Sequence, residues 1–228
     1  MPPMTLRQMA GLAPASTIDA ACTALLLIDF QREYADGGLA LNADAAGRQA
    51  ERLMNAADRI GLSVFHVHHV AANSGAKLFR PGSRGALPWP NLQPRQQHRC
   101  IEKRLPSAFA GTDLDTGLRG AGIEVIVVAG LMTHMCVDST ARDAMHRGYQ
   151  VIVVSDACAT RDLPGLGGTT IPAQAIHESA MAALADRFAD VVTSETLLQL
   201  LAEPPAACLR RILDRIAAER SLQCAESV

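Results

Sequence analysis

The sequence predicts an α/β protein of three α/β/α layers, with a central, mostly parallel, doubly wound sheet between two layers of helices. Three short segments, residues 23–28, 124–130 and 150–157, are hydrophobic at nearly every position. Continuous apolar runs of this length are typical of strands that are covered on both faces. Segments with helical periodicity separate these runs, and strand alternating with helix is the pattern of a doubly wound sheet.

Further elements follow in order along the chain. The weaker strand candidates are residues 63–70, 190–194 and 100–104. Helical periodicity covers about 44–60, 112–120 and 172–188. Another helix is expected after Cys136, with Gly148 at the position where it would end. Two segments rich in Gly or Pro, 71–99 and 160–170, are predicted loops. Such loops are either binding loops or lids, or ordered surface coil and subunit contacts.

The length and composition predict one domain. A chain of 228 residues that is 49% hydrophobic can bury one sizeable core, and it contains no polar linker that would divide it. We therefore expect a single domain over residues 1–228, with its core at about 20–201. Residues 205–223 carry an apolar stripe opposite a charged one and are predicted to form an additional amphipathic helix. This helix could pack on its own subunit or on a neighbour.

Charge and cysteine usage limit the possible partners. The formal net charge is −2 without a Lys/Arg cluster, so neither a nucleic acid nor a membrane surface is expected as a partner. A small-molecule substrate fits this charge distribution better.

The N-terminal apolar run is interrupted at Asp29, too early for a signal peptide, and a cytoplasmic protein is predicted. Six cysteines are scattered without a CxxC pair, which argues against a zinc knuckle or a thioredoxin-type site and predicts free thiols.

Two residues stand where a doubly wound sheet places its ligand crevice, at the carboxyl ends of strands. Asp29 directly follows the first strand, although it could equally cap a turn or bind backbone amides. Cys136 follows the 124–130 strand, and with Thr133 as N-cap it would be the third residue of a helix. A helix N-terminus lowers the pKa of a thiol, so a thiolate nucleophile is predicted at neutral pH. The alternative is a small buried hydrophobe; Cys158, also at a strand end, is the one rival.

A cysteine hydrolase also needs a proton acceptor, a cation and donors for an oxyanion. Asp29 could accept the proton. Lys103 could supply the charge, although a lysine in such a segment usually faces solvent. The backbone N–H groups of Met132 and Cys136 could form the oxyanion hole. For the substrate pocket, position alone suggests the stretches 66–73 and 160–170 and the residues Phe30, His68 and His134.

Three stretches, "LLLIDFQREY", "IEKRLPSAFAGTDLDTGLRGAGIEVIVVAGLMTHMCVDSTARDAMHRGYQVIVVSDACAT" and "HESAMAALADRFADVVTS", closely resemble the isochorismatase-like cysteine hydrolase family. The resemblance extends over most of residues 23–201, and the family also includes nicotinamidase and N-carbamoylsarcosine amidohydrolase. It implies that Asp29 is the general acid/base, Lys103 the triad lysine and Cys136 the nucleophile. It further implies a cis peptide between Leu131 and Met132 and a homo-oligomer, either a dimer or a tetramer.

The sequence departs from the nicotinamidase pattern after the second strand. Nicotinamidases usually carry a metal-binding aspartate with two histidines there, whereas this chain has "FHVHHVAANSG" with no aspartate. Strand alternation places His66 and His68 on one face and His69 on the other, which does not suit a compact three-ligand site. No metal and no other cofactor are therefore expected.

The combined pattern predicts an enzyme that hydrolyses an amide or carbamoyl C–N bond of a small molecule through a thioester acyl-enzyme. Isochorismatase-type cleavage of a vinyl ether, which needs the aspartate as an acid but no thiol, is one alternative. A non-catalytic small-molecule binding protein is another, although Asp29, Lys103 and Cys136 together speak against it. A thiol redox protein is disfavoured by the lack of a CxxC partner.

Overall fold

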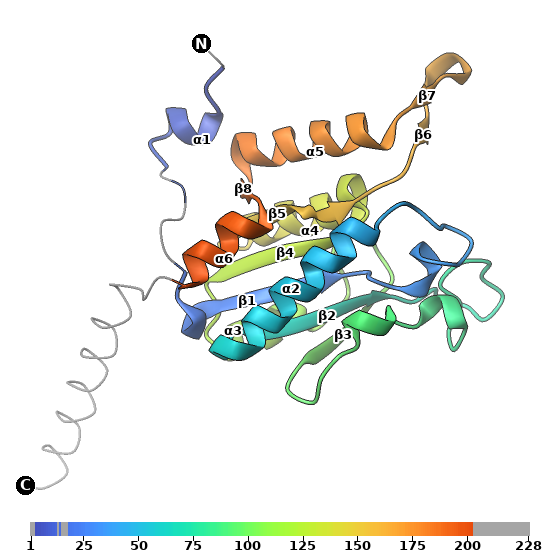
Figure 1. Cartoon of the computed structure of the whole chain (residues 1–228), viewed down its shortest axis with the longest axis horizontal. Coiled ribbons are helices and arrows are strands. Elements are labelled where there is room, and N and C mark those ends of the chain that lie inside the picture. Colours follow the sequence, from blue (N-terminus) through green and yellow to red (C-terminus); the bar gives the residue numbers. More distant parts are fainter. Residues whose placement is uncertain (1–2, 13, 15–17, 203–228) are drawn as a thin grey trace, which may run out of the picture.

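The computed structural model describes residues 3–12, 14 and 18–202. Six strands form one sheet in the order β3-β2-β1-β4-β5-β8, and every pairing is parallel (Figure 1). The strands are β1 (Thr23–Ile28), β2 (Ser63–His69), β3 (Arg99–Lys103), β4 (Val125–Leu131), β5 (Gln150–Ala159) and β8 (Asp190–Val192). The predicted three-layer, doubly wound fold is confirmed, and the mostly parallel sheet is parallel throughout.

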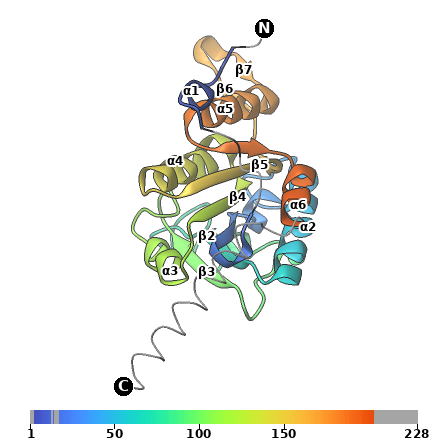
Figure 2. The same ribbon diagram turned by 90° about the vertical axis from the view of Figure 1, so that its left-hand side faces the viewer.

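Helices cover both faces of the sheet (Figure 2). One face carries α2 (Asp44–Ile60) and α6 (Ser194–Ala202), and the other carries α3 (Leu114–Gly120) and α4 (Asp138–His146). Beside α4 lies α5 (Ala173–Arg187), against which the short α1 (Leu6–Met9) packs. No helix in these described ranges is long and apolar enough to cross a membrane.

Short elements fill the connections. They are the turns η1 (Ala20–Cys22), η2 (Arg32–Tyr34), η3 (Arg84–Ala86), η4 (Pro90–Leu92), η5 (Thr133–Val137) and η6 (Leu166–Gly168), and the strands β6 (Leu163–Pro164) and β7 (Thr170–Ile171). The last two pair antiparallel and turn the predicted loop 160–170 into a small hairpin.

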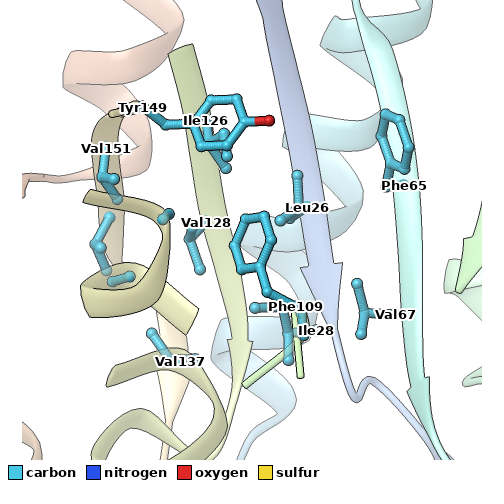
Figure 3. Close-up of a cluster of buried hydrophobic side chains, with 14 of the residues drawn as sticks. Leu26, Ile28, Phe65, Val67, Phe109, Ile126, Val128, Val137, Tyr149 and Val151 are labelled. Atoms are coloured by element: carbon cyan, nitrogen blue, oxygen red, sulfur yellow. The ribbon is translucent and has the colours of Figure 1, made fainter. Parts of the chain in front are cut away.

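The continuous apolar runs reflect burial on both faces of the sheet. Along β1 all six residues are buried, and successive side chains point to opposite faces. Leu26 and Ile28 join Phe65 and Val67 in a core cluster on the α3–α4 side (Figure 3). Leu25 and Leu27 instead pack in the α2–α6 cluster. A strand in this position has no solvent side, and its sequence therefore shows no polar alternation.

Most predicted elements match the structure within a few residues, and the exceptions lie near the chain ends. The strand predicted over 190–194 stops at Val192, and Ser194 begins α6, which the sequence analysis missed. The residue that stabilises the start of α6 is far away in the sequence: Asp156 accepts hydrogen bonds from Ser194 N at 2.7 Å and from Ser194 Oγ at 2.6 Å. The helix α1 was also missed, and the predicted helix at 205–223 lies outside the described residues.

The strand order creates a crevice between β1 and β4. The chain leaves β1 towards β2 and leaves β4 towards β5, and ligands bind at such a switch point, beyond the carboxyl ends of the strands. Gly130 sits at this place in β4 and pairs with Ile28. A Cβ on Gly130 would lie 2.6 Å from both the Cβ and the carbonyl oxygen of Ile28, which is too close for any side chain.

We therefore expect Gly130→Ala to separate β1 from β4 at their carboxyl ends and to lower the free energy of unfolding by about 1–3 kcal/mol, the usual cost of overpacking. Urea unfolding monitored by circular dichroism measures this change. Gly120→Ala is the matched control, because a Cβ at that helix terminus would meet no atom within 4 Å beyond its chain neighbours and the backbone of its own helix. An equal effect of the two substitutions would contradict the close-contact explanation.

Candidate active site

The carboxylate of Asp29 lies at the carboxyl end of β1 and is fully buried. Its backbone turns out of the strand with φ 55°, a left-handed conformation that aspartate tolerates better than most residues. The turn is held by hydrogen bonds from Asp29 N to Val67 O at 2.8 Å and from Gln31 N to Asp29 O at 2.7 Å. Asp29 therefore enters the crevice from a fixed backbone position.

The ammonium group of Lys103 connects the candidate catalytic residues. Lys103 is the last residue of β3, and its side chain has no exposed area. Its Nζ lies 2.8 Å from Asp29 Oδ2, 3.2 Å from Cys136 Sγ and 3.3 Å from the Leu105 carbonyl oxygen. With His69 Nδ1 at 3.5 Å, four groups that can accept a hydrogen bond or balance the charge surround the three donors of this ammonium. The alternative of a solvent-facing lysine is wrong.

Cys136 lies in η5, a single π-helical turn that leads into α4. The helix-capping prediction is wrong in detail, because the N-cap is Met132 and Thr133 makes no capping hydrogen bond. The Thr133 hydroxyl instead lies 2.9 Å from His177 Nδ1 on α5. The Met132 carbonyl accepts the N–H of Met135 at 3.0 Å and of Val137 at 3.3 Å, which fixes the turn around the thiol. The peptide between Leu131 and Met132 is cis, as the resemblance implied.

The thiol of Cys136 is not a ready-made thiolate. Burial first, and then the charge of Asp29, raise its pKa to about 12, and Lys103 offsets only part of this rise. Burial lowers the pKa of Lys103, but Asp29 and Cys136 outweigh it and hold that pKa above its usual value. The predicted thiolate at neutral pH is therefore wrong for the unliganded site: the lysine is charged and the thiol keeps its proton.

A cavity of about 360 Å³ opens onto Cys136. Its walls are largely apolar, with His69 and Arg161 among the polar side chains; the lining residues are Tyr34, Leu39, His69, Leu78, Phe79, Pro106, Met132, Met135, Cys136 and Arg161. Met132 and Cys136, whose amides were predicted to hold an oxyanion, both face this cavity. The stretches 66–73 and 160–170 contribute His69 and Arg161.

Three predicted pocket residues do not line this cavity. Phe30 packs edge-on against Trp89 in the α2–α6 core cluster, with ring centroids 5.5 Å apart. His134 Nδ1 lies 2.7 Å from the Thr160 hydroxyl. His68 follows the alternation of β2 onto the opposite face from His69, whose Nδ1 is 3.5 Å from Lys103 Nζ. The sequence named the right stretch but the wrong histidine, because the pairing of His69 with Lys103 depends on the sheet register.

Two buried polar residues that the sequence analysis missed hold the cavity walls. Gln31 donates to the carbonyls of His69 and Ala86, each at 2.9 Å, and accepts the His69 N–H at 2.7 Å. Glu33 accepts the backbone N–H of Gly38 at 2.6 Å and of Phe79 at 3.2 Å. Both lie in the "DFQREY" stretch, and buried side chains bonded to loop backbone leave no periodic signal in a sequence.

His66 belongs to a separate buried network that connects β2 to α2. Its Nε2 lies 2.9 Å from His98 Nδ1, and His98 Nε2 lies 2.8 Å from Asp58 Oδ1 at the end of α2. Burial first, and then His98, lowers the pKa of His66 to about 3. No group of three or more His, Cys, Asp and Glu side chains in the described part of the chain is arranged to hold a metal.

Comparison with known sequences places this site in a family. The profile of the Isochorismatase domain matches residues 23–196, which include all three residues joined by the Lys103 ammonium. The chain belongs to the isochorismatase-like hydrolase family. An isochorismatase from Pseudomonas putida has a similar crystal structure, with a TM-score of 0.79 and 35% identity over 85% of this chain and 98% of that one.

Other similar proteins of the isochorismatase-like family are named for different activities or for no activity. The uncharacterized family protein YddQ of Bacillus subtilis is 38% identical over 78% of this chain and 99% of its own length. Streptothricin hydrolase of Streptomyces noursei is 31% identical over 86% and 77%. The structure of N-carbamoylsarcosine amidase from Thermoplasma acidophilum has a TM-score of 0.66 and 28% identity over 76% and 96%. This isochorismatase-like chain is thus related to hydrolases, amidases among them.

The charges in the site predict an unusual effect of Asp29→Asn on the thiol. The negative charge of Asp29 raises the pKa of Cys136 and Lys103 lowers it, so a neutral amide should lower the pKa of Cys136 by about one unit or more. The pH dependence of iodoacetamide alkylation at Cys136, followed by mass spectrometry, measures this value. The exposed Cys100 provides the internal reference. An unchanged or higher pKa in the variant would refute the assigned electrostatics.

His66 predicts an acid-side loss of stability. Its pKa is about 3 in the folded chain against 6.5 in the unfolded chain, so only the unfolded chain gains a proton as the pH falls below 6.5. The free energy of unfolding should therefore fall between pH 7.5 and 5.0 by about 2 kcal/mol more in the wild type than in His66→Gln. Urea unfolding at both pH values tests this. The exposed His146→Gln should retain the wild-type pH dependence, and parallel behaviour of all three proteins would contradict the prediction.

Proposed function

We propose that this isochorismatase-like protein is a cysteine hydrolase that cleaves the C–N bond of an amide or carbamoyl group in a small molecule, through a thioester acyl-enzyme. One observation carries the proposal: a single buried ammonium contacts both the carboxylate of Asp29 and the thiol of Cys136 at the base of a small cavity. The similarity to streptothricin hydrolase and to N-carbamoylsarcosine amidase supports it.

In the first half-reaction, Asp29 removes the thiol proton while the sulfur of Cys136 attacks the carbonyl carbon. The N–H groups of Met132 and Cys136 stabilise the oxyanion of the tetrahedral intermediate. The C–N bond then breaks, and Asp29 returns the proton to the leaving nitrogen, so that ammonia or an amine departs. The thioester remains on Cys136.

In the second half-reaction, Asp29 takes a proton from water, and the resulting hydroxide attacks the thioester carbonyl. The C–S bond breaks, the acid leaves, and the sulfur regains its proton from Asp29. Because the pKa of Cys136 is high, the base is needed at the moment of attack instead of before it. Lys103 carries one positive charge throughout and therefore stabilises whichever partner is the anion.

Vinyl ether hydrolysis is less well supported by this geometry. That reaction needs a protonated Asp29 as an acid and leaves the thiol without a role. Here Lys103 directs one of its hydrogen bonds to Cys136 Sγ, at 3.2 Å, an arrangement that suits a sulfur which becomes negatively charged. The contact favours C–N hydrolysis.

Ammonia release from a panel of small primary amides and ureas tests the proposal. Cys136→Ala and Asp29→Asn should each lower kcat/KM by at least about 1000-fold, the scale typical of removing a nucleophile or its base. Cys158→Ala is the matched control, because this thiol is similarly buried but outside the site. Mass spectrometry of quenched wild-type reactions should detect the acyl group on Cys136. Full activity in either of the first two variants would disprove the mechanism.

A further inference from the structure

Glu33 is a buried carboxylate that the proposed mechanism does not use. It lies in η2 and is only 5% exposed. Its Oε1 accepts the N–H of Gly38 at 2.6 Å, and its Oε2 accepts the N–H of Phe79 at 3.2 Å. Hydrogen bonds from backbone N–H groups to a carboxylate are stronger than those to a neutral acceptor. Glu33 therefore ties two loop segments, residues 36–39 and 76–85, to η2.

The tied segments form one wall of the active-site cavity. Tyr34, Leu39, Leu78 and Phe79 all line this cavity, and none of them belongs to the sheet. The rings of Tyr34 and Phe79 pack edge to face, with their centroids 5.2 Å apart. The position of this apolar wall relative to Cys136 decides how much space an acyl group has beside the thiol.

The same two segments also border a second cavity, of about 510 Å³. Lys77 and Arg80 line this second cavity, whereas Leu78 and Phe79, between them in the sequence, line the active-site cavity. The wall is here a partition between two cavities, and Glu33 lines the second one. Because a partition has open space on both sides, its position depends on its hydrogen bonds more than on packing.

The backbone of the wall is held in a conformation that it would not keep by itself. Phe79 has φ 48°, a left-handed conformation that costs free energy in an aromatic residue and persists only where the surroundings enforce it. Its N–H is bound by Glu33, and its carbonyl oxygen accepts the N–H of Ala71 at 2.9 Å. The carboxylate is also closely enclosed, because a Cβ on Gly85 would collide with Glu33 Oε2.

We propose that Glu33 is a positioning residue that fixes this wall and thereby sets the largest acyl group that the active-site cavity admits. The inference deepens the proposed function and rests on it for hydrolysis alone, since the space beside Cys136 is a property of the wall. The carboxylate of Glu33 binds Gly38 and Phe79 and not the catalytic residues. Its loss should therefore change which molecules reach the thiol and leave the reactivity of the thiol unchanged.

Hydrolysis of a ring series tests the inference in Glu33→Gln. This substitution keeps the size of the side chain but leaves one acceptor oxygen, so one of the two backbone N–H groups faces an NH₂ group and is released. The amides from cyclopropanecarboxamide to cycloheptanecarboxamide grow by one methylene at a time. At the step that exceeds the cavity, kcat/KM should fall about 10-fold or more in the wild type and about 3-fold or less in Glu33→Gln, chiefly through KM.

Alkylation of Cys136 measures the same size limit without turnover. Iodoacetamide is compared with iodoacetamides whose nitrogen carries the same rings, and mass spectrometry follows each rate. The ratio of the iodoacetamide rate to that of the largest reagent that labels the wild type should fall at least about 3-fold in Glu33→Gln. The rate with iodoacetamide itself should not change. Labelling of Cys158, which is buried outside the cavity, should not accelerate, because the whole fold does not open.

The alkylation series separates this inference from the proposed function. If the wild type hydrolyses none of the ring amides but the alkylation ratio falls in Glu33→Gln, the role of Glu33 stands and the proposed reaction fails for these amides. If the ratio is unchanged, the role of Glu33 is refuted, whatever the activity.

Asp36→Asn is the matched control, because Asp36 joins the same two segments at the surface. Its Oδ2 accepts hydrogen bonds from Arg84 Nη2 at 2.6 Å and from Arg32 Nη2 at 2.7 Å, and its side chain is 41% exposed. Exposed ion pairs contribute little to holding a structure together. Asp36→Asn should therefore keep the wild-type size limit in both assays, and an effect equal to that of Glu33→Gln would overturn the inference.

Gly85→Ala gives a second, independent test that also decides the matter if Glu33→Gln does not fold. Its methyl group displaces the carboxylate from its backbone partners while Glu33 itself is unchanged. The size limit should weaken in the same direction as in Glu33→Gln. Gly75→Ala is the control in the same loop region, because its Cβ would meet only Asn73 Oδ1, at an ordinary 3.6 Å. A wild-type size limit in Gly85→Ala would contradict the inference.

Discussion

The buried ammonium of Lys103 is the interaction on which the active site depends. Removing a lysine charge from water costs several kcal/mol, and the cost is offset only if anionic or polar partners surround the charge closely. Asp29, Cys136 and the Leu105 carbonyl do so at 2.8–3.3 Å. Each partner is delivered by a different segment, so the ends of β1 and β3 and the turn after β4 must converge. The ammonium therefore couples the chemistry of the site to the register of the sheet.

Close packing of the strand ends makes this convergence possible. Gly130 lets β4 approach β1 at the level of Ile28, one residue before Asp29. On the other side, Gln31 fixes both backbone groups of His69, which pairs with Lys103 across β2 and β3. Neither residue touches the thiol. They bring the carboxylate and the ammonium to the same depth, where a displacement of one ångström would leave a buried charge without its partner.

The sequence predicted the framework well because the framework has a repeating physical cause. Burial on both faces produced the unbroken apolar run of β1, and helical periodicity gave the bounds of α2. The site was predicted in its residues but not in its electrostatics. A helix start suggested an acidic thiol at Cys136, whereas burial and the nearby Asp29 raise its pKa to about 12. Depth of burial and the sheet register are properties of the assembled fold, so no local pattern around the cysteine reports them.

The same limit explains why the cavity residues were only approximately located. Tyr34 comes from η2, His69 from the end of β2 and Arg161 from the segment after β5. Tertiary contacts such as the hydrogen bonds between Gln31 and His69 bring these elements together, and periodicity does not report such contacts. The proposed reaction also leaves the net charge of the catalytic group unchanged. Asp29, Lys103 and the thiol form a unit with no net charge before attack, and it stays neutral as the proton moves from sulfur to carboxylate and the negative charge moves to the oxyanion.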